Sequence, residues 1–170
     1  VSELRRRPSI DVFEKSTSFA RSINDKEKII GIDILAQLGI NPRFKQSETI
    51  KLYFELIDAE QNDKVLTSIL YGISHNNENL TKKQVEKLVT YKNHNNVEVR
   101  QALVNSLYGL ENTTAIDALI QLSQDKVASI RDWATFGLGS QIETNSKKII
   151  DALWNRINDK DQNSKFEAIV

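Results

Sequence analysis

The stretch DKVASIRDWATFGLGS, residues 125–140, decides the fold, because its apolar residues recur at steps of three and four positions. That spacing places apolar side chains along one face of a helix. The apolar positions of this stretch are Val127, Ile130, Trp133, Ala134, Gly137 and Leu138. The stretch therefore predicts one amphipathic helix.

The same pattern returns on both sides of this stretch. With Ile130 as the anchor, the matching positions are Ile30, Val65, Val99 and Ser164, so successive copies lie 35, 34, 31 and 34 residues apart. Two more columns of the alignment are apolar: Ile34, Ile69, Leu103 and Ala168 match Ala134, and Leu38, Ile73 and Leu107 match Leu138. A period of this size indicates one supersecondary unit per repeat, which buries its apolar face only by stacking on its neighbours.

Each repeat is expected to hold two helices, because a second apolar stripe follows the first in every copy and no segment shows the alternation of a half-buried strand. The predicted fold is therefore all-α, an α/α solenoid or superhelix of helical hairpins. We expect helix N-caps at Ser9, Ser47 and Thr81. The predicted organisation is a flexible N-terminal tail at 1–8, followed by a single solenoid at 9–170 with a capping helix at 9–22, repeats at about 25–58, 60–91, 94–124 and 125–158, and a partial repeat at 159–170.

Composition excludes several classes of function. The 170 residues include 23 basic and 23 acidic side chains and no cysteine, which removes thiolate catalysis and cysteine zinc sites. A formal net charge of zero gives no electrostatic reason to expect a dedicated nucleic-acid or membrane-surface binder. No apolar run reaches membrane-spanning length, so we expect a soluble, cytoplasmic protein. Methionine is absent, and we expect the chain to be a fragment of a longer array.

No group of residues forms a catalytic pattern. The two histidines, His75 and His94, each occur in an asparagine-rich loop, where we expect solvated side chains and not a metal or acid/base pair. No HExxH, GxSxG or phosphate-loop motif occurs. We therefore expect a protein that is not an enzyme and that holds no cofactor or metal.

The segment IRDWATFGLG, Ile130 to Gly139, resembles the first-helix motif of HEAT-repeat proteins with the short repeats of the phycobilin-lyase-like group, in which a branched aliphatic residue and Arg are followed by Ala and then Leu-Gly. The resemblance covers about residues 25–170. It implies a HEAT-type solenoid, and such arrays are mostly interaction scaffolds.

The resemblance also implies a polar ladder between repeats, formed by an Asp just before the first helix and an Arg six residues later. Asp125 and Arg131 match that pattern, and Asp159 with Lys165 keeps the charges. The other copies depart from it: Asp25 faces Gly31, Glu60 faces Leu66, and His94 faces Arg100.

In a HEAT-type array the second helices line the concave surface, so their outward positions form columns across the repeats. These columns are mixed in charge and slightly acidic, which suits a protein or peptide partner better than a phosphate backbone. The residues that we expect to contact this partner are Glu86, Asp117, Gln121, Lys148, Asp151 and Asn155. The oligomeric state does not follow from the sequence.

Two alternatives stay open. HEAT-like alkylpurine DNA glycosylases use aromatic and acidic residues, and Asp132, Trp133 and Trp154 are of those types. Both tryptophans lie in the apolar phase of their helices, which favours a role in the core. The other alternative is a bilin-lyase-like subunit, which the family resemblance alone suggests.

Overall fold

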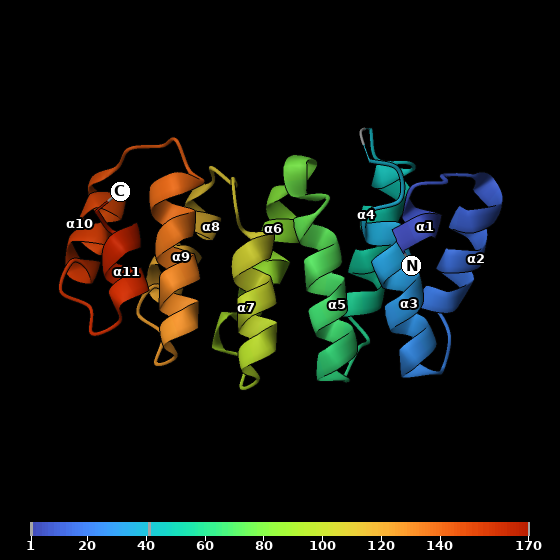
Figure 1. Cartoon of the computed structure of the whole chain (residues 1–170), viewed down its shortest axis with the longest axis horizontal. Coiled ribbons are helices and arrows are strands. Elements are labelled where there is room, and N and C mark those ends of the chain that lie inside the picture. The colour runs from blue at the N-terminus through green and yellow to red at the C-terminus, as the bar shows by residue number, and fades with distance from the viewer. Residues whose placement is uncertain (1, 41, 170) are drawn as a thin grey trace. The chain divides into compact units, whose positions relative to one another are not determined.

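The structure of the chain is a computed structural model that describes residues 2–40 and 42–169 (Figure 1). Every regular element in these residues is helical, as predicted for an α-solenoid fold. None of the helices in this part of the chain is long and apolar enough to cross a membrane. The chain divides into two compact units, Val1–Asn76 and Asn77–Val170.

The first unit is organised around a central helix. Its helices are α1 (Ser2–Arg5), α2 (Ile10–Ala20), α3 (Asp25–Ala36), α4 (Gln46–Ile57) and α5 (Asp63–Ser74). Helix α3 packs against both α2 and α5, and α4 packs against α5. The core between these helices contains Ile32, Tyr53 and Ile69, all fully buried. The hydroxyl of Tyr53 donates a hydrogen bond of 2.7 Å to the Ile32 carbonyl, so the one polar atom of this side chain is satisfied in the core.

The second unit repeats the same arrangement. Its elements are the 3-10 helix η1 (Asn77–Asn79), α6 (Lys82–Leu88), the 3-10 helix η2 (Val89–Asn93), α7 (Val97–Ser106), α8 (Thr113–Leu122), α9 (Ala128–Ser140), α10 (Lys147–Arg156) and α11 (Gln162–Glu167). Helix α9 packs against α7 on one side and α11 on the other, while α8 and α10 pack against α9 from behind (Figure 1). Its core contains the fully buried Leu88, Leu103, Leu119 and Ile130.

Most helices begin at a polar side chain that caps the backbone. The predicted caps at Ser9 and Thr81 are confirmed, and Thr81 forms a reciprocal capping box with Gln84. The predicted cap at Ser47 is wrong, because α4 begins one residue earlier, at Gln46, and the chain enters it through a left-handed Lys45 with φ of 53°. Ser47 therefore lies inside the first turn of the helix.

The structure differs from the predicted domain organisation at two places. The segment expected to be a flexible tail contains α1, and Arg5 holds it on α3: its Nε donates to the Asp33 carbonyl at 2.9 Å, and its Nη1 donates to Gln37 at 3.0 Å. The residues predicted as one solenoid also fall into two units, and the boundary in the sequence, after Asn76, lies inside the predicted repeat 60–91. Val1 and Val170, at the ends of the predicted tail and partial repeat, lie outside the described residues.

Gly31 is the point at which α2 and α3 come closest. A Cβ atom at this position would collide with the backbone of Ser16 and Ala20 in α2. Because these are backbone atoms, a larger residue can be accommodated only if the helices move apart.

We predict that Gly31→Ala destabilises the protein by about 1–3 kcal/mol, because overpacking outweighs the higher helix propensity of alanine. Thermal unfolding followed by circular dichroism measures the change. Ser129→Ala, at an exposed position of α9, is the control and should leave the midpoint unchanged. An unchanged midpoint for Gly31→Ala would show that α2 does not approach α3 as closely as the structure has it.

Candidate functional site

Two arginine–aspartate pairs connect successive repeats within the second unit. Arg100 on α7 donates from Nε and Nη2 to the carboxylate of Asp125, at 2.7 and 3.0 Å. Arg131 on α9 donates in the same way to Asp159, at 2.8 Å for both bonds. Each pair joins a first helix to the loop that precedes the next first helix. The planar guanidinium matches the two carboxylate oxygens, which makes these bonds strong and directional.

Each arginine also organises the loop before its own helix. The Nη1 of Arg100 donates to the carbonyls of His94 and Asn95, at 2.7 and 3.2 Å, and that of Arg131 donates to those of Asp125 and Lys126, at 3.0 and 3.3 Å. The carbonyls of these loops therefore find donors. One guanidinium thus connects three segments of chain.

The aspartates receive further hydrogen bonds that hold them ionised. Asp125 accepts from the Val127 amide at 2.9 Å, and Asp159 accepts from the Asp161 amide at 2.9 Å and from Arg156 at 2.8 Å. The hydrogen bond from Arg131 holds the pKa of Asp159 well below its usual range. Burial alone would raise the pKa of Asp125, but the hydrogen bond from Arg100 and the nearby amide outweigh it, and its pKa is lowered.

The observed pairs run between successive repeats, as the family resemblance implies. Three of the predicted ladder residues take part in them: Arg131 binds Asp159 of the next repeat, and Asp125 binds Arg100 of the preceding repeat. Lys165 lies outside both pairs. Arg100 could have been found from the sequence, since it occupies the arginine column six residues after His94.

The first unit has a related connection built from other residues. Lys28 on α3 forms a 2.8 Å ion pair with Glu60, which precedes α5, and Asn62 donates to Asp25 at 2.7 Å. The hydrogen bond that Lys28 donates to Glu60 raises the pKa of Lys28. The lysine stands one turn before Gly31, where the family pattern has arginine. A search for arginine at a fixed position therefore misses this connection.

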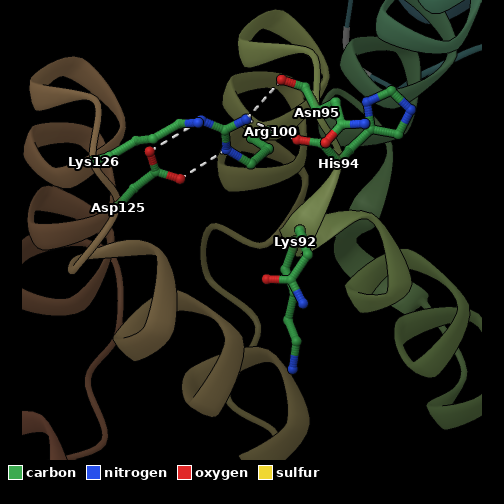
Figure 2. Close-up of a pocket in the computed structure, with 7 residues that line it drawn as sticks. Lys92, His94, Asn95, Arg100, Asp125 and Lys126 are labelled. Atoms are coloured by element: carbon green, nitrogen blue, oxygen red, sulfur yellow. Dashed lines mark hydrogen bonds and ion pairs between the residues drawn. The ribbon is translucent and has the colours of Figure 1, made fainter.

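A polar pocket of about 250 Å³ surrounds the Arg100 pair (Figure 2). Figure 2 shows the Arg100 guanidinium between Asp125 and the loop carbonyls, with Lys92 extending away from it. Its lining consists of Lys92, Asn93, His94, Asn95, Arg100, Asp125 and Lys126. Within this pocket the guanidinium of Arg100 and the carboxylate of Asp125 neutralise each other, while Lys92 and Lys126 also line it.

The histidines belong to different units and have structural contacts. The Nε2 of His75 lies 2.7 Å from the Gln37 side-chain nitrogen, and burial followed by the charges of Arg43 and Arg5 lowers the pKa of His75. The Nδ1 of His94 accepts from the Asn96 amide at 3.2 Å, so His94 is not the solvated loop residue that we expected. Within residues 2–40 and 42–169, no three His, Cys, Asp or Glu side chains are placed to hold a metal ion.

The predicted contact residues all lie exposed on the second helices of the second unit: Glu86 on α6, Asp117 and Gln121 on α8, and Lys148, Asp151 and Asn155 on α10. The structure brings several of them together with neighbours. Lys148 pairs with Asp117 at 3.0 Å across α10 and α8, and Gln121 donates to Asn93 at 2.8 Å across α8 and η2. Glu86 and Asp151 pair with lysines on their own helices, Lys82 and Lys147.

The prediction that Trp133 and Trp154 are core residues is wrong. Their exposed fractions are 44% and 66%. Trp133 occupies the column that holds the small, fully buried Ala102 in the preceding repeat. Instead its ring meets Phe136 edge to face at 5.8 Å, and the Tyr108 hydroxyl donates to the Trp133 carbonyl at 3.1 Å.

The stacked helical hairpins define a HEAT-like helical-repeat fold. A solved structure with the same fold is the crystal structure of YibA from Escherichia coli, with a TM-score of 0.75 and 20% sequence identity over 98% of this chain and 60% of that chain. The chain therefore spans 60% of the length of YibA. No family model matches the chain, and no curated protein matches it. The likeness to YibA shows the fold.

The Arg131–Asp159 pair should stabilise the folded protein to an extent that depends on pH. Asp159→Asn leaves the partly buried Arg131 charge without its partner, and we predict a loss of about 2–4 kcal/mol at neutral pH in chemical denaturation. Because the folded pKa of Asp159 is lowered, its contribution is complete above the unfolded value of about 4 and is lost as the pH falls through the lower folded value. The variant should therefore lose less stability than the native chain between neutral and acidic pH.

The control for this prediction is Asp151→Asn, which removes the exposed pair with Lys147 and should change little at any pH. Part of the acid sensitivity should persist in Asp159→Asn, because Asp125 remains paired with Arg100. Equal losses in the two variants would contradict a special role for the buried pair.

Proposed function

We propose that this chain is a non-catalytic interaction scaffold that binds a protein or peptide on the exposed face of its second helices. The observation that carries the proposal is the row of exposed polar residues on α6, α8 and α10, which we call the second-helix face: Glu86, Asp117, Gln121, Lys148, Asp151 and Asn155. Contacts between neighbouring helices, such as Lys148 with Asp117, support their placement on one side of the second unit.

The ion pairs on this face are suited to exchange with a partner. The side chains of Lys148 and Asp117 are 64% and 50% exposed, and such pairs contribute only about 0–1 kcal/mol each. A partner that offers its own charges can therefore replace them at little cost. Electrostatic matching of this kind gives specificity and rapid association more than raw affinity.

A DNA-directed function is the alternative that one observation favours, namely the exposure of Trp133 and Trp154. Asp132 lies beside Trp133, and burial, followed by the charges of Glu167 and Asp161, raises its pKa. Against this alternative, the second-helix columns are slightly acidic, whereas a phosphate backbone requires basic side chains. Release of a base from alkylated DNA by the purified chain would establish a glycosylase. The bilin-lyase-like alternative would require binding of a tetrapyrrole.

The test of the scaffold proposal is a charge reversal on the second-helix face. We predict that Glu86→Lys, Asp117→Lys and Asp151→Lys together abolish capture of a protein that the native chain retains from cell lysate, because Lys at position 117 would face Lys148. Quantitative mass spectrometry of the captured proteins measures the loss.

The matched control is Glu78→Lys, Glu98→Lys and Glu143→Lys, which makes the same change in net charge at exposed positions outside the second helices. It should retain the captured protein. If both triple variants lose that protein, net charge and not this face governs binding; if neither loses it, the second-helix face is only a solvated surface.

A further inference from the structure

The polar pocket around the Arg100–Asp125 pair carries more positive than negative charge. Three basic side chains line it, those of Lys92, Arg100 and Lys126, against the single carboxylate of Asp125, so the formal charge of the lining is +2 with His94 counted as neutral. Among the described residues, Arg100 alone of these three basic groups forms an ion pair, and its partner is Asp125. The pocket therefore attracts anions.

This excess of positive charge follows from one departure in the repeat pattern. In this repeat His94 occupies the column that is acidic in the others, where its members are Asp25, Glu60, Asp125 and Asp159. At the next connection, the hydrogen bond to Asp159 raises the pKa of Arg131, and the charge of Asp125, the residue that matches His94, adds to this effect. The pocket around Arg100 lacks that second carboxylate, because its lining contains Asp125 as the one acidic residue.

The buried Arg100 side chain keeps one hydrogen-bond donor for a ligand. A guanidinium has five N–H groups. Nε and one N–H of Nη2 donate to Asp125, and Nη1 donates to the carbonyls of His94 and Asn95. These four bonds leave the second N–H of Nη2 without a partner among the described residues. The Arg100 side chain is only 5% exposed, so an oxygen of a ligand in the pocket would satisfy a donor that burial makes costly to leave unpaired.

Lys126 can supply a second charge at the same place. Figure 2 shows its side chain directed toward the Arg100–Asp125 pair, whereas Lys92 points away. Burial raises the pKa of Asp125, but hydrogen bonds from Arg100 and the Val127 amide, followed by the charges of Arg100 and Lys126, lower it. The ammonium group of Lys126 thus lies within electrostatic reach of the pair. Because Lys126 is exposed and its side chain is flexible, it can turn to an anion that Arg100 holds.

We propose that this pocket binds a phosphate group, held by Nη2 of Arg100 and by the ammonium group of Lys126. A phosphate dianion matches the formal charge of the lining, and its tetrahedral oxygens accept hydrogen bonds from both groups at once. The pocket volume of about 250 Å³ is roughly eight times the 30 Å³ of a water molecule, which leaves room for the phosphate with part of its hydration shell.

The phosphate is either the free inorganic ion or the head of a small monoester. Bound there, it would join the loop that precedes α7 to the loop that precedes α9, and it would stabilise the connection between their repeats. The site shares no residue with the second-helix face, so it does not depend on the scaffold function proposed above.

The test is an NMR titration of the nitrogen-15-labelled protein with sodium phosphate at fixed pH, with sodium chloride keeping the ionic strength constant. We expect saturable shifts of the Arg100 Nε–H signal and of the amide signals of residues 93–96 and 125–127. Lys126→Ala should weaken binding about tenfold, because one charge-assisted hydrogen bond is lost. A parallel titration with O-phosphoserine distinguishes the two sources: binding as tight as that of phosphate supports a monoester, and much weaker binding supports the free ion.

The matched control is Lys160→Ala, because Lys160 follows Asp159 as Lys126 follows Asp125, and both lysines are exposed. It removes the same charge outside the pocket and should leave the affinity for phosphate unchanged. His94→Asp restores the acidic residue of the other repeats and should weaken binding as Lys126→Ala does. Equal losses of affinity in the two lysine variants would overturn the proposal. Shifts that grow linearly with phosphate, or that chloride alone reproduces, would overturn it as well.

Discussion

No helical hairpin of this chain can bury its apolar face alone, and the rest of the structure depends on that constraint. Ile130 and Leu138 of α9 are buried among helices that come from the repeats before and after it, and Tyr53 is buried against α3 and beside Gly72 of α5. Each buried side chain of this size contributes about 1.5–3 kcal/mol before conformational entropy is subtracted. Because the contacts cross between repeats, the stability of each hairpin is a property shared with its neighbour.

The same stacking brings together backbone carbonyls that need hydrogen-bond donors, and the arginines of the arginine–aspartate pairs supply these donors. Stacking the first helices side by side also brings the loops that lead into them close together, and the carbonyls of these loops need donors. Arg100 and Arg131 supply those donors from Nη1 while Nε and Nη2 bind the next aspartate. Lys28 in the first unit has a single ammonium group, so its pair with Glu60 joins two segments without the bidentate geometry. The geometry of the connection between repeats is therefore more strictly defined in the second unit than in the first.

The repeat columns are sufficient to predict the helical-repeat fold, because burial at regular intervals requires apolar residues at regular intervals in the sequence. Thr81 and Gln84 likewise predicted a cap, since a capping box depends on local spacing alone. The Lys28–Glu60 connection was not predictable in the same way, because Lys28 lies three residues before the arginine column and a fixed spacing does not find it. The exposure of Trp133 was not predictable either, because its helical phase predicts burial and the phase alone does not show how much room the neighbouring helices leave.

The second-helix face would recognise a partner mainly by charge. Its ion pairs already satisfy one another, so a partner gains selectivity there but little free energy from each pair. Lys148 of α10 binds Asp117 of α8, and Gln121 of α8 binds Asn93 of η2, so side chains from successive elements are linked across this face. A partner that replaces one of these contacts therefore changes the environment of two neighbouring elements at once.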